Sequence, residues 1–157
     1  MQTSSKKAFT MVELIFVIVV IGILSAIAIP KLAATRDDAE ITKAVSTVGS
    51  VRSAIATERQ KRILRGDFTA ITSLNSTGTN MAFSTFNADA AGNTGNVLEY
   101  AMNDCTGQGK TQGCWSVQAG PIYRYNMPTS GFVDFNISNS RFECTNPADA
   151  NCRLLTQ

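Results

Sequence analysis

The feature that most constrains this chain is a long apolar run near its N-terminus. Between Lys7 and Lys31 lie 23 residues, and Glu13 is the only charged one among them. An apolar stretch of about 20 residues is long enough to cross a bilayer as a helix. Because Lys6 and Lys7 precede the run, the positive-inside rule predicts a cytoplasmic N-terminus and a remainder that lies outside the inner membrane.

A removable secretory signal is the alternative to a retained membrane helix. Such a signal has a basic start, an apolar centre of about 7–15 residues and a small-residue cleavage site. Residues 25–28 loosely resemble such a site. The apolar run here is longer, however, and a further helical pattern follows it, so we favour a retained helix.

Glu13 is explained neither by a plain anchor nor by a plain signal. A charge at the centre of a membrane helix is costly, whereas near the helix end it reaches the interface and faces the positive end of the helix dipole. Glu13 is therefore either a tolerated interfacial carboxylate or a group that pairs with a cation inside a protein assembly. The residues alone leave both interpretations open.

The segment after the apolar run continues the helical pattern. Gly22 and Pro30 weaken helices, and Pro30 either ends the helix or kinks a longer one. Continuation is favoured because apolar side chains recur at three- and four-residue steps, at Ile41, Val45, Val48, Val51 or Arg52, and Ile55. We predict one helix over residues 10–65, softened near Gly22 and bent near Pro30, with an apolar stripe that lies on a sheet.

The charged residues give little support to nucleic acid as the main partner, because the formal net charge is only +2. We interpret the basic cluster near the predicted helix end as a solvated surface, and contact with DNA or lipid as a less favoured alternative. This cluster comprises Arg59, Lys61, Arg62 and Arg65.

The sequence carries no sign of catalysis or of a cofactor. It has no histidine, which removes the commonest general base and metal ligand. It also lacks a P-loop, a G-x-S-x-G motif and a zinc signature. Loop residues such as Asp104 and Asp149 have the chemistry to bind calcium, but solvated loops are the favoured interpretation. We therefore predict that the chain is no enzyme and has no cofactor.

Four cysteines lie in the C-terminal third, and an even number in an exported chain predicts disulfides. Three pairings are open, of which Cys105–Cys114 with Cys144–Cys152 is the simplest because both bridges close short loops. Zinc ligation is the competing interpretation, but neither spacing matches the usual knuckle.

The rest of the chain predicts an α+β fold. Residues 66–96 are loop-like with a short helix at 71–74, and strands are predicted at 97–102, 114–119, 122–126 and 132–137. These would form an antiparallel sheet of about four strands, in which Trp115, Tyr123 and Tyr125 are packing residues. Residues 142–157 would form a disulfide-closed loop.

The string KKAFTMVELIFVIVVIGILSAIAIP, together with the helix after it, resembles type IV pilins and type II secretion pseudopilins. The matching parts are the basic leader, Phe9, a Glu five residues into the processed chain, the apolar length and Pro30. Where the family usually has Gly before the cleaved bond, this chain has Ala8.

This resemblance implies a pilin-like fold with a leader at 1–8, a membrane and assembly helix at 9–30, its amphipathic continuation at 31–66 and a loop-and-sheet domain at 67–157. It also implies that a prepilin peptidase cuts between Ala8 and Phe9 and methylates the new amine of Phe9. Glu13 would then pair with the Phe9 amine of a neighbouring subunit.

The implied function is that of a structural subunit of a pilus or secretion pseudopilus, used for adhesion or motility, protein secretion or DNA uptake. Its partners would be other copies of itself, the peptidase, an inner-membrane assembly platform and, before assembly, membrane lipid. DNA is a partner that nothing in the sequence indicates. The alternative is a membrane-tethered or secreted binding protein that does not polymerise.

Overall fold

The computed structural model describes residues 9–75 and 80–157, without the side chains of residues 33 and 34. The leader and Ala8, on which the predicted cleavage falls, lie outside the described residues. The chain divides into two compact units between Arg36 and Asp37, which are described in turn.

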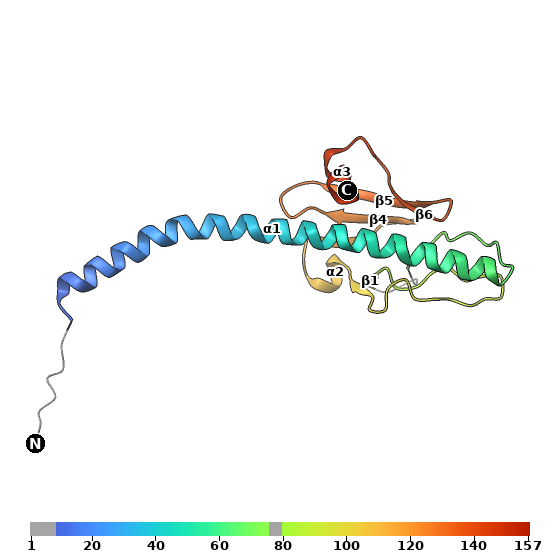
Figure 1. Ribbon diagram of the computed structural model, residues 1–157, viewed down its shortest axis with the longest axis horizontal. Coiled ribbons are helices and arrows are strands. Elements are labelled where there is room, and N and C mark those ends of the chain that lie inside the picture. Colours follow the sequence, from blue (N-terminus) through green and yellow to red (C-terminus); the bar gives the residue numbers. More distant parts are fainter. Residues whose placement is uncertain (1–8, 76–79) are drawn as a thin grey trace, which may run out of the picture. The chain divides into compact units, whose positions relative to one another are not determined.

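The first element is helix α1 (Met11–Leu64), which is 54 residues long and is labelled in Figure 1. Its bounds confirm the predicted helix over residues 10–65. The helix continues through Pro30, although proline has no N–H to donate to the preceding turn. A bend at Pro30 and a softening near Gly22 stay predictions.

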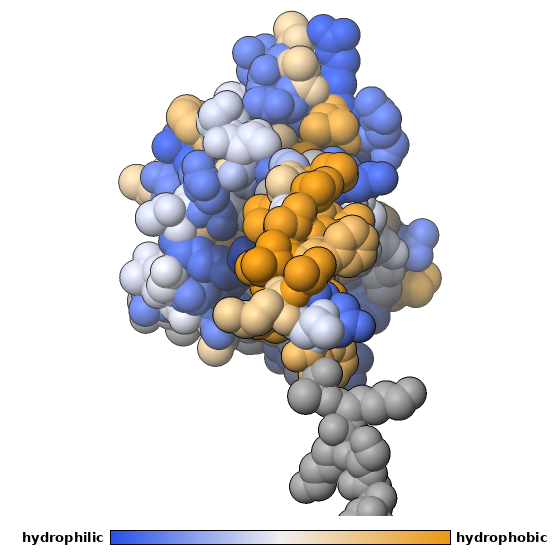
Figure 2. Space-filling view, turned by 90° about the vertical axis from the view of Figure 1, so that its left-hand side faces the viewer, coloured by the Kyte–Doolittle hydropathy of each residue, from blue (hydrophilic) through white to orange (hydrophobic). Residues whose placement is uncertain are grey.

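The N-terminal unit exposes its apolar side chains. Every residue from Phe9 to Leu32 is exposed, including Phe16 at 69% and Ile29 at 67%. Figure 2 shows these hydrophobic side chains gathered as one patch. By length and composition, α1 can cross a membrane.

The C-terminal unit contains a four-stranded antiparallel sheet in the order β3-β4-β5-β6. Its strands are β3 (Cys114–Val117), β4 (Ile122–Asn126), β5 (Phe132–Ser138) and β6 (Arg141–Cys144). A second sheet pairs β1 (Met81–Ala82) with β2 (Met102–Asn103). Two short helices, α2 (Cys105–Gln108) and α3 (Ala150–Thr156), complete the unit.

The core of this unit lies between the second half of α1 and the sheet. The helix contributes Ala44, Val48, Val51 and Ile55, all buried, which confirms the predicted apolar stripe. The sheet contributes aromatic rings that touch one another at the ring edges or faces, and these are Trp115, Tyr123, Tyr125, Phe135 and Phe142. The three predicted packing aromatics are therefore confirmed as core residues.

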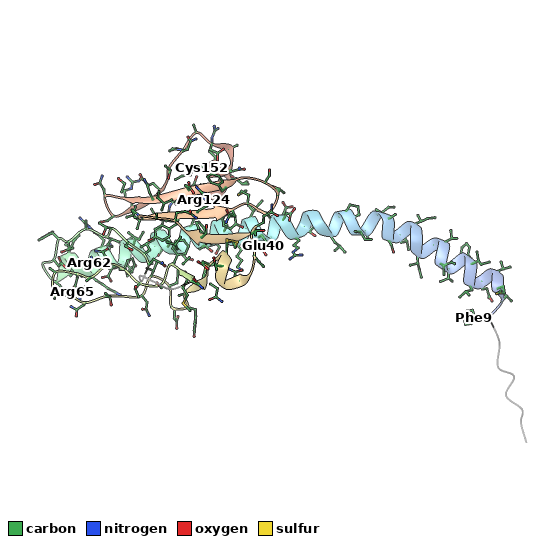
Figure 3. The ribbon with its side chains drawn as sticks, turned by 180° about the vertical axis from the view of Figure 1, so that it is seen from behind. Phe9, Glu40, Arg62, Arg65, Arg124 and Cys152 are labelled. Carbon is green, nitrogen blue, oxygen red and sulfur yellow. A yellow bond between two sulfur atoms is a disulfide. The ribbon has the colours of Figure 1, made fainter. Side chains whose placement is uncertain are left out.

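The outer face of the sheet is polar and internally paired. Arg124 of β4 lies opposite Asp134 of β5 in the register, and its Nε and Nη2 donate to the two carboxylate oxygens at 2.7 and 2.9 Å. The guanidinium carbon also lies 3.7 Å from the centre of the Phe132 ring. Arg124, which is labelled in Figure 3, thus joins neighbouring strands through one charged pair and one cation–π contact.

Three predictions for the C-terminal unit were wrong. Residues 97–100 form bends and residue 101 is irregular, so that only Met102 of the predicted strand pairs, in β2. Residues 71–74 are not helical. The segment 142–157 is no plain loop, because it carries most of β6 and all of α3. The fourth strand of the sheet is therefore β6, which follows all of the predicted strands in the chain.

Two disulfides hold the C-terminal part of this unit. Cys105 at the start of α2 is bonded to Cys114 at the start of β3. Cys144 at the end of β6 is bonded to Cys152 in α3. Each bridge joins a cysteine to its nearest neighbour along the chain, and the short loops limit the freedom of the unfolded chain.

Candidate assembly site

The start of α1 is fixed by a reciprocal pair of contacts between Thr10 and Glu13. The Thr10 amide and the Thr10 hydroxyl both donate to Glu13 Oε2 at 2.9 Å. In return the Glu13 amide donates to Thr10 Oγ1 at 3.3 Å. This arrangement is a capping box, in which each side chain satisfies a backbone N–H that the first helical turn leaves without a partner.

The same carboxylate lies among exposed apolar side chains. Phe9, Met11 and Val12 are 85, 78 and 76% exposed, and Leu14 follows at 57%. Within residues 9–75 and 80–157, no group donates a hydrogen bond to Glu13 Oε1, in contrast to Oε2. The first turn of α1 therefore presents one carboxylate oxygen that no described residue contacts, within an apolar surface.

The predicted site residues do not all lie together. Phe9 precedes α1 and Glu13 lies in its first turn, whereas Gly22 and Pro30 lie about 14 and about 26 Å beyond Glu13 along α1, at roughly 1.5 Å per residue. A side-chain carbon added at Gly22 would meet nothing within 4 Å. The single subunit thus offers no close packing that requires glycine at this position.

Thr10 is the member of this site that sequence reasoning missed. Its signal was present, because Thr10 and Glu13 form the T-x-x-E spacing of a capping box directly before an apolar run. The prediction treated Glu13 as a charge only and did not consider what it could do for the backbone.

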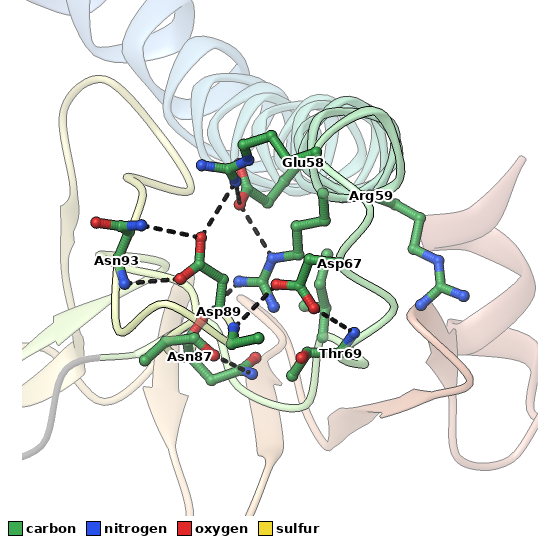
Figure 4. A network of polar contacts seen from close by, with 12 residues as sticks. Glu58, Arg59, Asp67, Thr69, Asn87, Asp89 and Asn93 are labelled. Carbon is green, nitrogen blue, oxygen red and sulfur yellow. Dashed lines mark hydrogen bonds and ion pairs between the residues drawn. The ribbon is translucent and has the colours of Figure 1, made fainter.

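A second group of polar contacts lies at the other end of α1 (Figure 4). Arg62 is fully buried and donates from Nε to Glu58 Oε1 at 3.1 Å and from Nη2 to the Asn87 carbonyl at 2.6 Å. Arg65, which is half exposed, lies 3.3 Å from Asp89 Oδ2. The interpretation of this basic cluster as a solvated helix end was therefore wrong for Arg62, whose charge is buried against the loop that follows the helix (Figure 3).

The same loop is held by two carboxylates that accept backbone N–H groups. Asp67 accepts from the amides of Thr69 and Ala90 at 2.8 and 2.9 Å. Bonds from the Thr69 hydroxyl, the Ala90 amide and the Thr69 amide lower the pKa of Asp67 to about 2. The Asn93 amide, 2.7 Å from Asp89 Oδ1, is the main cause that lowers the pKa of Asp89. This second group of contacts therefore holds the loop against the C-terminal end of α1.

The two loop carboxylates that were considered as calcium ligands lie at the starts of short helices. Asp104 caps α2 by accepting from the Gly107 amide at 2.7 Å, and Asp149 precedes α3. Within the described residues, no group of three or more Cys, Asp or Glu side chains is placed to hold a metal ion. The start of α1 is thus the site at which this chain's unusual chemistry is concentrated.

Comparisons with known proteins match the N-terminal helix, and one of them extends into the C-terminal unit. Residues 3–29 match the family model of the prokaryotic N-terminal methylation motif. The chain is 33% identical over 110 residues to the type IV major fimbrial protein FimA of Dichelobacter nodosus, covering 60% of this chain and 70% of that one.

Two other relatives match a shorter stretch. The chain is 48% identical over 59 residues to the type IV narrow pilus major component PilA5 of Thermus thermophilus, covering 36% of this chain and 51% of that one. It is 36% identical over 55 residues to the type II secretion system core protein G of Klebsiella michiganensis, covering 35% of this chain and 39% of that one. No solved structure matches the chain significantly.

Proposed function

Because this chain belongs to the type IV pilin and pseudopilin family of structural subunits, we propose that it polymerises into a filament through its N-terminal helix. The observation that carries the proposal is the helix surface itself, which is apolar and exposed from Phe9 to Leu32. Such a surface is stable in a bilayer or against other helices, but not in water.

The helix has two environments in this proposal. Before assembly, residues 9–30 cross the inner membrane with the N-terminus in the cytoplasm, and in the filament they pack as a bundle with other copies. Lipid tails are as apolar as these side chains, so packing and register drive the transfer more than the hydrophobic effect does. Residues 31–64 continue the helix, and residues 67–157 cover the outside of the filament.

Processing prepares the helix for this transfer. A prepilin peptidase removes residues 1–8 by cutting between Ala8 and Phe9, and the new amine of Phe9 is methylated. Phe9 is 85% exposed and lies outside the helix, which begins at Met11. The cut would therefore fall next to an exposed residue that precedes the first turn of α1.

Glu13 sets the register between copies. A carboxylate buried in a bundle of apolar helices is costly unless a cation pairs with it. The amine of Phe9 on a neighbouring copy is such a cation, and only one axial offset between two helices brings it to Glu13. The pair thus favours one stagger over all others.

A surface pilus is the first candidate for the filament. The match to a major fimbrial protein covers 110 residues and so extends far beyond the length of α1, which has 54. A secretion pseudopilus is the second candidate, supported by the 55-residue match to a core protein G. Either filament acts by assembling and carries no catalytic residues of its own.

The test replaces Glu13 by glutamine and counts filaments. Glutamine keeps the capping contacts with Thr10, because its amide oxygen accepts the same N–H, but it carries no charge. We expect normal membrane insertion, loss of residues 1–8 and about tenfold fewer filaments in sheared surface material seen by electron microscopy. Glu99→Gln makes the same chemical change at an exposed loop position and is expected to leave filaments unchanged.

Three results would contradict the proposal. Wild-type numbers of filaments from Glu13→Gln would exclude the pairing role. A native protein that retains residues 1–8 would exclude processing at Phe9. A chain that stays a single unit while its export machinery is active would exclude polymerisation and would favour a membrane-tethered or secreted binding protein.

A further inference from the structure

We propose that a small cavity between α1 and the sheet binds one water molecule, which accepts a hydrogen bond from Trp115 Nε1 and donates to the hydroxyl oxygens of Thr47 and Tyr125. The water joins α1 to strands β3 and β4 inside the C-terminal unit. This inference is independent of filament assembly, because it concerns the core of a single copy.

The indole of Trp115 is a buried donor. Trp115 is 2% exposed, and within the described residues its Nε1 has no hydrogen-bond partner. An indole N–H can only donate, and a buried tryptophan normally finds an acceptor for it. A buried donor without an acceptor has lost the water that it bonds to in the unfolded chain, so Nε1 favours any acceptor that can reach it.

Trp115 lines a cavity of about 10 Å³, which is roughly the room that one water molecule needs. The wall that α1 contributes includes Thr47, and the wall that the sheet contributes includes Tyr125 and Trp115. A cavity of this size is too small for a larger ligand. Buried waters make about three hydrogen bonds, so a water here needs two polar atoms besides Nε1.

The two hydroxyl oxygens on the cavity wall act as acceptors, because their own hydrogens are already used. Thr47 Oγ1 donates to the Lys43 carbonyl at 2.8 Å, and Tyr125 Oη donates to the Glu40 carbonyl at 3.0 Å. A longer contact from Thr47 Oγ1 to Met102 Sδ, at 3.8 Å, uses the same hydrogen. Burial, with a smaller contribution from Glu40, raises the pKa of Tyr125 to about 12, so this hydroxyl keeps its hydrogen at neutral pH.

Donors and acceptors therefore match for a single water. Its oxygen accepts the hydrogen of Trp115 Nε1, and its two hydrogens go to Thr47 Oγ1 and Tyr125 Oη, each of which has lone pairs to accept them. The result is three hydrogen bonds that link one helix to two strands. Such a water satisfies the one donor of the indole that the described residues leave without a partner.

The test observes the indole proton of Trp115 by nuclear magnetic resonance. The full-length chain is purified in detergent with isotope-labelled tryptophan, and because Trp115 is the only tryptophan, one indole N–H signal is present. A water that stays in the cavity transfers magnetisation to this proton through space, and the sign of the transfer in the rotating frame separates it from chemical exchange. We expect such a cross peak at the water frequency in the wild-type chain.

Two variants each remove one acceptor with little change of shape. Thr47→Val and Tyr125→Phe are each expected to weaken the cross peak several-fold, because one hydrogen bond to the water is lost. The double variant is expected to lose the cross peak, because one polar partner does not hold a buried water. Thr42→Val is the matched control on the same helix: its exposed hydroxyl donates to the Asp38 carbonyl, and we expect an unchanged cross peak.

Three results would overturn the proposal. The first is a wild-type chain without the cross peak. The second is a cross peak that one single variant abolishes and the other leaves unchanged, since that signal would come from one exchanging hydroxyl. The third is a cross peak that persists in the double variant. Variants that unfold are recognised by the fluorescence of Trp115, and the wild-type measurement decides the proposal without them.

Discussion

Arg62→Met is expected to lower the free energy of unfolding of the C-terminal unit by about 3 kcal/mol. The Arg62 side chain is fully buried and donates to Glu58 Oε1 at 3.1 Å and to the Asn87 carbonyl at 2.6 Å. Methionine replaces the long apolar stem with little change of volume, so the substitution removes the charge and the donors while it retains most of the packing.

The magnitude follows from the groups that the substitution leaves behind. Removing one partner of a buried ion pair costs about 3–5 kcal/mol, because the other charge stays buried without compensation. Two features place Arg62 at the low end. Its Nη1 has no hydrogen-bond partner in the described structure, so part of its burial is already unfavourable. Arg65 also stays 3.8 Å from Glu58 and compensates part of its charge.

The assay is a urea titration of the full-length chain in detergent, followed by the fluorescence of Trp115. Trp115 is the only tryptophan and is 2% exposed, so its emission reports the core of the C-terminal unit. Wild type and Arg62→Met are compared at the same pH and salt concentration, and the shift of the midpoint at constant slope gives the change in free energy.

Arg141→Met is the matched control. Arg141 Nε lies 3.0 Å from Glu143 Oε1, close to the 3.1 Å of the buried pair, but the two side chains are 76 and 45% exposed. Exposed pairs contribute about 0–1 kcal/mol, so we expect a loss below about 1 kcal/mol here. An Arg62→Met loss as small as that of Arg141→Met would refute the argument from burial.

Two further predictions concern Asp67, in the loop that follows α1, and Ser140, in the turn between β5 and β6. The pKa of Asp67 is lowered to about 2 from 3.8, so the stabilisation by its ionised carboxylate is complete above about pH 4 and is lost as the pH falls towards 2. Asp67→Asn should therefore reduce the loss of unfolding free energy between about pH 4 and about pH 2. An unchanged loss over this range would contradict the prediction. Ser140 Oγ accepts from the buried Ile71 amide at 3.1 Å and from Arg59 Nη1 at 3.0 Å. Ser140→Ala should therefore cost about 1–3 kcal/mol in the same urea titration, whereas the exposed Ser138→Ala should cost little.

The long helix could be predicted because its signals are local and repeated. The apolar run and the stripe from Ile41 to Ile55 each specify one surface of a helix, and the stripe is the one that packs on the sheet. Proline at position 30 did not interrupt the pattern on either side. The helix end at Leu64 is also local, since Gly66 has a positive φ of 76° that suits a helix stop.

The membership of the sheet was harder to predict. Val97 is buried, as a strand residue would be, but its amide bonds to Ser84 in a loop and not to the sheet. The β5–β6 hairpin was missed because Asn139 and Ser140 both adopt positive φ, at 51 and 60°, in a tight turn without glycine. Helix α3 had a weak signal in Asp149 ahead of residues 150–156, which the interpretation as a plain loop did not use.

The role of Arg62 could not be predicted from local patterns. Its neighbours along the chain are basic, and a cluster of basic residues at a helix end is typical of a solvated surface. The burial of Arg62 arises because the loop that carries Asn87 and Asp89 folds back over the helix end and brings these two residues to it. Tertiary contact of this kind leaves no periodicity in the sequence.

The chain order of the sheet has a consequence for how the two disulfides form. Each strand from β3 to β6 pairs with its neighbour along the chain, and the two disulfides span sequence separations of only 9 and 8 residues. Closing such short loops is rapid and entropically cheap, so each thiol meets its native partner far more often than either of the other two. We therefore expect oxidation of the four thiols to form the native pairs directly, with little need for an isomerase to rearrange wrong pairs.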